Sequence, residues 1–329
     1  MIEGFRDSIF KIKNRTEFNR FALEIFYYQS DNNPVYKDFI FNLGIRPESV
    51  RYPDTMPFLP IEFFRNHKVV TGTTSVETVF ESSGTTGTTT SRHYITDLSV
   101  YENSFTNGFS NFYGNPSGYF FAGLLPSYIE RGNSSLIYMV DRLINASHDP
   151  RSGFFTDEVD KLIDNLQKAK NEKQKSILIG VSFALLDLAE KHSPDLSGII
   201  IVETGGMKGR RKEITREELH SALKKGFNIR SVHSEYGMTE LLSQAWSKGD
   251  GIFYCPPWMK IIIRDPGDPL SILDHYGTAG GINVIDLANF NSCSFIATND
   301  LGKLYEDGGF EVLGRFDSSD IRGCNLLVE

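Results

Sequence analysis

The chain has 329 residues, of which 40% are hydrophobic and 23% are charged, and its formal net charge at pH 7 is -8. This composition is typical of a globular protein and argues against a disordered chain. The net negative charge argues against a general nucleic-acid binder, because phosphate binding requires a basic face. The three cysteines form no CxxC pair, which predicts reduced thiols and a cytoplasmic location. The most apolar stretch, Ile177–Leu188, is too short for a membrane span of ~20 residues.

The order of the predicted elements indicates an α/β fold. Residues 1–65 carry apolar side chains at helical spacing, which predicts helices ending near the proline-rich segment Tyr52–Pro60. From Val69 onward, short apolar runs alternate with helical patterns, as in folds with helices packed on a mostly parallel sheet. Strands are predicted at Thr78–Phe80, Gly118–Leu125, Ser176–Gly180, Gly198–Val202 and Ile229–Val232, and helices at Asp157–Lys170 and Phe183–Lys191.

One further helix has explicit start and stop signals. Thr215 and Glu218 form a Thr-x-x-Glu capping box, which predicts a helix through Lys225 with Gly226 as its stop.

After Pro256 the pattern changes to short strands separated by Gly, Asp and Asn turns. These strands are predicted at Met259–Arg264, Gly281–Ile285, Ser294–Thr298 and Phe310–Gly314. The expected organisation is therefore a helical segment of the main domain at residues 1–65, an α/β core at 66–255 and a β-rich subdomain at 256–329.

A loop rich in Ser, Thr and Gly follows the strand predicted at Thr78–Phe80. Its glycines allow a tight turn that exposes backbone N–H groups to an anion, and its hydroxyls add further donors. It is not a Walker A loop, because no Gly-Lys-Ser/Thr follows Gly87. A flexible polar linker is the alternative interpretation. The candidate phosphate contacts are Ser82, Ser83, Gly84, Thr85, Thr86, Gly87 and Thr88.

Three downstream features favour a nucleotide site. The segment Ser234–Glu240 places the hydroxyl of Thr239 beside the carboxylate of Glu240, a pair suited to a phosphate oxygen and to Mg²⁺. Asp300 is expected at the end of a strand, where its carboxylate can accept hydrogen bonds from two ribose hydroxyls, although an Asx turn is the commoner explanation. Gly314–Asp317 then offers a basic residue and a carboxylate at a turn.

In this order the four features resemble the adenylate-forming superfamily of acyl-CoA synthetases, peptide-synthetase adenylation domains and luciferases. The resemblance runs from about Phe80 to the end of the chain and implies the large N-terminal domain of these enzymes, with ATP and Mg²⁺ as cofactors. It implies that the loop binds the ATP phosphates and that Gly205 and Gly206 lie near the adenine. It also implies that Tyr236, Gly237, Thr239 and Glu240 supply the phosphate and metal contacts, with Asp300 and Arg315 at the ribose or hinge. The family usually has Gly where this chain has Asn299, so the resemblance does not define the backbone conformation at this position.

The chain ends shortly after the hinge-like Gly314–Asp317, so most of the family's C-terminal domain, with its catalytic lysine, is expected to be absent. Lys208, in the basic run after Gly206, is the best local substitute, although such runs are more often solvated surface. The shortened plan resembles the acyl-protein synthetases of the LuxE type, as do segments such as Leu125–Arg131 and Ile285–Asn289. In that branch the acyl group passes to a cysteine near the C-terminus, which corresponds to Cys324. Arg322 beside it would favour the thiolate. The alternative is that Cys324 packs as a small apolar residue with Leu326 and Leu327 in a final strand.

The leading hypothesis is an acyl-protein synthetase that activates a fatty or aromatic carboxylic acid and forms a thioester on Cys324. An acyl-CoA reductase, an acyltransferase or a carrier protein is then the expected partner. The tail Ile321–Asn325 also resembles phenylacetate–CoA ligases, so an enzyme that delivers its adenylate to CoA or a carrier protein is the alternative. A non-catalytic acyl-AMP binding module is the third. Cys255 and Cys293 are expected to pack. His233 is expected to line the acyl pocket, to orient the carboxylate or to pack in the core, and the aromatic run Tyr101–Tyr119 to line an acyl tunnel or the core.

Overall fold

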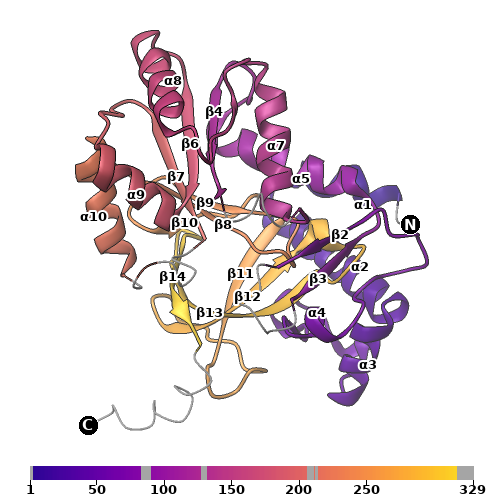
Figure 1. Cartoon of the computed structure of the whole chain (residues 1–329). Helices are drawn as coiled ribbons and strands as arrows, with labels where there is room; N and C mark the ends of the chain where they lie inside the picture. Colours follow the sequence, from indigo (N-terminus) through magenta and orange to yellow (C-terminus); the bar gives the residue numbers. More distant parts are fainter. Residues whose placement is uncertain (1–2, 83–89, 127–131, 206–210, 212–213, 317–329) are drawn as a thin grey trace, which may run out of the picture. The chain divides into compact units, whose positions relative to one another are not determined.

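The computed structural model describes residues 3–82, 90–126, 132–205, 211 and 214–316 (Figure 1). The chain divides into two compact units, and each is described by itself. The first unit comprises Met1–Ser104, Thr239–Ser243 and Tyr254–Glu329, and the second comprises Phe105–Met238 and Gln244–Phe253. The boundary falls within one helix, after Ser104. The division into residues 1–65, 66–255 and 256–329 remains a prediction.

The described helices are α1 (Glu3–Ser8), α2 (Arg15–Asn32), α3 (Pro34–Asn42), α4 (Phe63–Asn66), α5 (Leu98–Tyr113), α7 (Ser135–Ser147), α8 (Val159–Asn171), α9 (Ser182–His192) and α10 (Arg216–Phe227). The described strands are β1 (Leu59–Pro60), β2 (Thr78–Glu81), β3 (Arg92–Ile95), β4 (Phe120–Leu124), β5 (Gly153–Phe154), β6 (Ser176–Val181), β7 (Ile200–Thr204), β8 (His233–Tyr236), β9 (Ala245–Ser247), β10 (Ile252–Phe253), β11 (Met259–Arg264), β12 (Ala279–Asp286), β13 (Phe295–Leu304) and β14 (Phe310–Arg315).

The second unit is built on a six-stranded sheet in the order β5-β4-β6-β7-β8-β9. The strands from β5 to β8 are parallel, and β9 runs antiparallel to β8. Every residue of β4 and β6 is buried, as expected for strands covered on both faces. Helices α8, α9 and α10 lie on one face of this sheet and α7 on the other (Figure 1). The predicted α/β class is therefore confirmed.

Helix α10 begins as predicted but ends differently. Thr215 and Glu218 form both hydrogen bonds of the capping box. Gly226 was expected to stop the helix, and this was wrong: the helix continues to Phe227, and Asn228 caps it in the left-handed conformation with φ 53°. A Cβ on Gly226 would lie 2.7 Å from the Cβ of Ala189 on α9, so this glycine serves close helix packing rather than termination.

The strand predicted at Ile229–Val232 was also wrong. The strand begins at His233, directly after the predicted range, because the parallel register pairs His233 with Val202 and Ser234 with Glu203. The segment Ile229–Val232 leads into the sheet but does not pair. The more polar segment His233–Tyr236 extends beside β7 instead, and it carries the start of the candidate motif to the edge of the sheet.

The first unit combines N-terminal helices with an antiparallel sheet. Strands β11, β12, β13 and β14 pair in this order, and β1 adds to β13 in parallel. The strand predicted at Met259–Arg264 is confirmed with the same bounds. Gln29 of α2 fixes this helix to the sheet, because its side-chain amide donates to the backbone carbonyls of Asn289, Phe290 and Ser292. Among the described residues, no helix has the length and apolar character needed to cross a membrane.

Candidate functional site

The Ser/Thr/Gly loop joins the two strands of a hairpin, and its ends are tied together. Strands β2 and β3 pair antiparallel, with Glu81 opposite Arg92. The Ser82 backbone N–H donates to the Ser91 carbonyl at 3.0 Å, and the Ser91 N–H donates to the Ser82 hydroxyl at 2.9 Å. Ser82 therefore has a structural role at the base of the loop. The other predicted phosphate contacts, Ser83, Gly84, Thr85, Thr86, Gly87 and Thr88, lie outside the described residues and remain predictions.

Glu240 lies in the first unit as a buried carboxyl group with 5% of its surface exposed. Burial is the largest influence on it and raises its pKa. A hydrogen bond from Ser91 and the positive charges of Arg65 and Arg315 act in the opposite direction. Ser91 directly follows the loop, so the base of the loop and the candidate metal ligand are in contact. This arrangement places one carboxylate in a basic environment that suits an anionic ligand.

The backbone of Thr239 and Glu240 is held by two side chains from distant parts of the chain. The Nδ1 of His93 lies 2.8 Å from the Thr239 carbonyl oxygen, and its Nε2 lies 3.0 Å from Oδ1 of Asn289. Asn289 in turn donates from Nδ2 to the Glu240 carbonyl at 2.7 Å. Burial lowers the pKa of His93 to about 4. These contacts fix both carbonyl groups of the predicted Thr-Glu pair.

Asp286 fixes the residues that follow Glu240. Its fully buried carboxylate accepts hydrogen bonds from the backbone N–H groups of Leu242 at 2.8 Å and Ser243 at 3.0 Å. It also accepts from the Ser243 hydroxyl at 2.6 Å and the Ala288 N–H at 3.1 Å. Burial raises the pKa of Asp286 to about 6, while these hydrogen bonds favour its charged form.

Asp300 is a mostly buried residue in the interior of β13, with Arg315 of β14 as its direct partner across the ladder. The prediction that Asp300 ends a strand was therefore wrong. Pairing with β14 continues the strand to Leu304, past the turn-like residues Asn299 and Asp300. The Nε of Arg315 lies 3.5 Å from Oδ1 of Asp300, and the Arg315 side chain is 86% exposed. An exposed guanidinium beside a mostly buried carboxylate is compatible with the predicted ribose contact.

In the second unit, Gly205 follows the C-terminal end of β7 with φ 68°, a conformation that favours glycine. Just before it, Glu203 faces helices α9 and α10. Its carboxylate lies 3.8 Å from Nε of Arg216 and 3.6 Å from Nε2 of His220, and it accepts a hydrogen bond from Ser182 at 3.2 Å. Gly206 and Lys208 lie outside the described residues. Arg211 is described, and its guanidinium forms ion pairs with Asp187 and Glu190.

Glu235 stands one residue before the predicted Tyr-Gly motif. Its Oε2 accepts a 2.6 Å hydrogen bond from the Thr204 hydroxyl. Burial raises the pKa of Glu235 to about 7, and the charge of Glu203 acts in the same direction. A Cβ at Gly237 would lie 2.3 Å from Oε1 of Glu235, so a side chain at Gly237 would displace this carboxyl group. Tyr236 is buried against Phe253.

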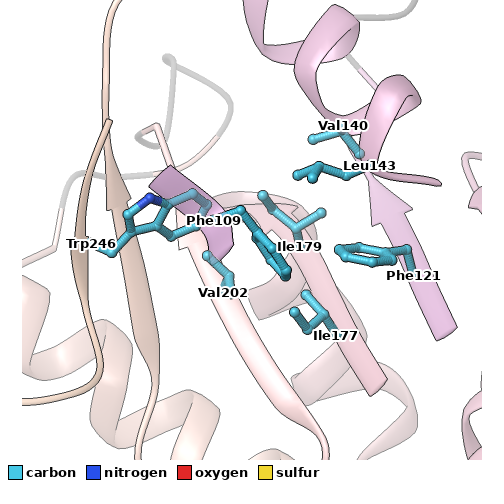
Figure 2. A pocket seen from close by; sticks show the side chains of 8 residues that line it. All are labelled: Phe109, Phe121, Val140, Leu143, Ile177, Ile179, Val202 and Trp246. Atoms are coloured by element: carbon cyan, nitrogen blue, oxygen red, sulfur yellow. The ribbon is translucent and has the colours of Figure 1, made fainter. Parts of the chain in front are cut away.

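A small apolar cavity of about 10 Å³ lies on the face of the six-stranded sheet of the second unit that carries Val202 and Trp246 (Figure 2). Such a volume has room for about one water molecule. Part of the predicted aromatic run reaches it, since Phe109 is one of its walls, whereas Tyr113 instead stacks on His233 with its hydroxyl 3.1 Å from Nδ1. Burial lowers the pKa of His233 to about 4. The lining residues are Phe109, Phe121, Val140, Leu143, Ile177, Ile179, Val202 and Trp246.

Of the cysteines, Cys293 is fully buried and Cys255 is partly buried, and burial raises the pKa of both thiols, that of Cys293 to about 12. The expectation that both pack is consistent with this burial. Cys324 lies outside the described residues.

The candidate Mg²⁺ ligand is Glu240. Within the described ranges, no group of three or more His, Cys, Asp or Glu side chains is arranged to hold a metal ion. A single carboxylate nevertheless fits Mg²⁺, which proteins commonly bind through one or two carboxylates together with substrate phosphates. The partners of Glu240, namely the hydroxyl of Ser91 and two nearby guanidinium groups, also suit a metal that arrives with phosphate oxygens.

Comparisons with solved structures address the fold. The chain is similar to ATP-bound MatB from Rhodopseudomonas palustris, with 20% identity and a TM-score of 0.55, over 74% of this chain and 49% of MatB. It is also similar to 2-hydroxyisobutyryl-CoA ligase in complex with 2-HIB-AMP and CoA, with 13% identity and a TM-score of 0.69, over 93% of this chain and 77% of that one. The amide bond synthetase McbA from Marinactinospora thermotolerans matches with 19% identity and a TM-score of 0.50, over 72% of this chain and 48% of McbA. The chain has the fold of the adenylate-forming enzymes.

This fold is that of their large N-terminal domain, and the chain spans about half the length of the MatB structure. No protein-family model and no curated protein matches the sequence. The structural neighbours named here share 13–20% identity with the chain and the same fold.

Several residues that support the site carry no local sequence signal for that role. Ser91, His93 and Asn289 hold the Thr239–Glu240 pair, and Asp286 holds the turn after it. Asn289 and Asp286 stood in a segment noted only for its resemblance. The signal available for Glu235 was an acidic residue in a short strand that ends at a glycine.

Proposed function

We propose that this protein activates a carboxylic acid with ATP, forming an acyl-adenylate and pyrophosphate. The observation that carries the proposal is Glu240 itself, a buried carboxyl group hydrogen-bonded to Ser91 at the base of the candidate phosphate loop and influenced by Arg65 and Arg315. The adenylate-forming fold supports it. In this reaction a carboxylate oxygen of the acid bonds to the α-phosphorus of ATP, and the bond to pyrophosphate breaks.

The roles of the residues follow from their chemistry. Mg²⁺, when bound, would neutralise phosphate charge in the transition state. Glu240 would hold the metal, and His93 and Asn289 keep its backbone in place so that little reorganisation is needed during reaction. Asp300 would accept from the ribose hydroxyls with Arg315 beside it. Gly205 and Gly206 would leave room for the base, and the loop from Ser82 to Thr88 would donate to the phosphates.

Carboxylate-dependent exchange of labelled pyrophosphate into ATP tests this proposal. We expect exchange with at least one acid in a panel from acetate to palmitate that includes aromatic acids, and loss of exchange when Mg²⁺ is chelated. Absence of exchange with every acid, in a protein that still binds ATP in a calorimeter, would indicate a binding module and contradict the enzymatic proposal.

The finer proposal is an acyl-protein synthetase of the LuxE type, acting in the cytoplasm on a fatty acid. The thiolate of Cys324 would attack the carbonyl carbon of the adenylate, the bond to AMP would break, and the thiol proton would go to solvent. A thiolate is a strong nucleophile, and its attachment to the same chain makes the step intramolecular. A reductase, an acyltransferase or a carrier protein would then accept the acyl group.

Replacing Cys324 by Ser is expected to abolish covalent labelling while exchange continues. The measurement is incubation with ATP and a labelled acid, followed by denaturing electrophoresis and mass spectrometry of the acylated peptide. Cys255→Ser is the matched control and should keep the label. Retention of the label by Cys324→Ser would refute the transfer step, and formation of acyl-CoA on addition of CoA without any labelled protein would favour the CoA-ligase alternative.

A further inference from the structure

Glu235 occupies a place where small ligands bind in α/β proteins. It lies on β8, near the C-terminal ends of the parallel strands β7 and β8, and ligands commonly bind outside these ends. The residue is partly buried. It directly precedes the Tyr236–Glu240 segment of the proposed ATP site.

Glu235 differs from its neighbour Glu203 in its partners. Glu203 faces Arg216 and His220 and accepts from Ser182. Because side chains alternate along a strand, Glu235 and Thr204 face the opposite side of the sheet from Glu203. There Thr204 is the hydrogen-bond donor to Glu235, and no Lys, Arg or His in the described ranges forms an ion pair with it. Its other oxygen, Oε1, has acceptor capacity for a ligand.

Trp246, the residue opposite Glu235, has a hydrogen-bond donor that lacks an acceptor among the described residues. Trp246 is the direct partner of Glu235 across the antiparallel pair β8–β9, so the two side chains leave the same face of the sheet. The indole is buried, with 2% exposed, and its Nε1–H has no hydrogen-bond acceptor within the described part of the chain. A buried donor without an acceptor is energetically unfavourable. Figure 2 shows this indole beside Phe109 at the wall of the apolar cavity.

A hydroxyl group can both donate to a carboxylate and accept from an indole N–H, and it is the smallest organic substituent that does so. An ammonium group has no acceptor, and an alkyl group has neither function. We propose that Glu235 and Trp246 recognise a hydroxyl group on the acid substrate, so that the substrate class is hydroxy carboxylic acids. This inference rests on the proposed function and names the substrate of the same site.

The wild-type protein gives the first test, without any variant. Matched acids with and without a hydroxyl, at positions 2, 3 and 4 from the carboxyl group, are compared in the exchange assay. The assay is run above pH 8, where Glu235, with a pKa of about 7, is charged. A hydrogen bond to this charged partner predicts a preference of about 10- to 100-fold in kcat/KM for one hydroxy acid over its deoxy partner. Equal use of the deoxy acids at all three positions would overturn the inference while leaving acid activation intact.

Glu235→Gln tests the residue. We expect it to lower kcat/KM for the preferred hydroxy acid by about 10- to 100-fold and to change that for the deoxy acid by less than about threefold, so that the preference is lost. Trp246→Phe removes the N–H while keeping a ring and should weaken the same preference. Glu203→Gln is the matched control, and it should keep the ratio between the two acids whatever its effect on rate. An unchanged ratio in Glu235→Gln would also overturn the inference.

Failure of the proposed function gives a different result. If no acid supports exchange, calorimetry with the matched acids and ATP separates recognition of the hydroxyl group from adenylation of the acid. Binding of the hydroxy acid alone would then support recognition without adenylation, and equal or absent binding of both acids would refute the recognition as well.

Discussion

Replacing Glu240 by Gln is expected to lower acid-dependent ATP–pyrophosphate exchange by about 10²- to 10³-fold, the usual effect of removing one preorganised electrostatic group. Glutamine keeps the shape and can still accept from Ser91, but it removes the charge that would hold Mg²⁺. Since Glu240 is 95% shielded from solvent, water cannot readily replace that charge. The measurement is exchange at saturating acid over a range of Mg²⁺ concentrations.

Two controls make this result interpretable. Glu306→Gln changes an exposed acidic residue of the first unit and should leave exchange unaltered. The Glu240→Gln protein should unfold at a midpoint close to that of the wild type, because the backbone contacts of Asn289 and His93 do not involve the carboxylate. Full exchange by a folded Glu240→Gln protein would remove Glu240 from the proposed metal site.

Replacing Asp286 by Ala is expected to destabilise the protein by about 3–5 kcal/mol. The substitution leaves the buried N–H groups of Leu242, Ser243 and Ala288 without their acceptor, and each unpaired group costs about 1–3 kcal/mol. Equilibrium denaturation followed by tryptophan fluorescence measures this, and Trp258 of the same network is a suitable reporter because its indole N–H lies 3.0 Å from the Ser243 hydroxyl.

Asp286→Asn should be milder, at about 1–2 kcal/mol, since its amide oxygen can still accept from two of the N–H groups while its amide nitrogen faces another donor. Asp307 is exposed and provides the control. Apart from the loss of its local hydrogen bonds, such as the one from the Gly309 N–H, Asp307→Ala should change the free energy of unfolding by less than about 0.5 kcal/mol. A loss below about 1 kcal/mol in Asp286→Ala would mean that the turn after Glu240 is held by other contacts.

The sequence was sufficient for elements whose signals are local. The strand Met259–Arg264 lies in a region of short strands separated by clear turns. The capping box at Thr215 and Glu218 is a short-range pattern. The two errors at strands came from long-range pairing. His233 begins a strand because Val202 stands opposite it, and Asp300 lies inside a strand because β14 continues the ladder beyond it. Neither partner is visible from a short window.

The same distinction applies to the site. Thr239, Glu240 and Asp300 could be selected because their side chains suit phosphate, metal and ribose. Their supports could not, since His93 lies 146 residues before Thr239 in the chain, and Asn289 lies 49 residues after Glu240. Gly226 had a plausible role as a helix stop, but the position of Ala189 on the neighbouring helix decides its actual role.

The hydrogen bonds of Gln29 have a consequence for the order of folding during synthesis. Its side chain bonds to Asn289, a separation of 260 residues, whereas the second unit uses only chain between Phe105 and Phe253. At about 5–20 residues per second, the ribosome needs on the order of 10–50 s to deliver those partners after Gln29 emerges. The N-terminal helices must therefore wait for these partners with apolar faces uncovered, and the second unit has its whole chain before the partners emerge. Chaperone dependence should be concentrated in that interval.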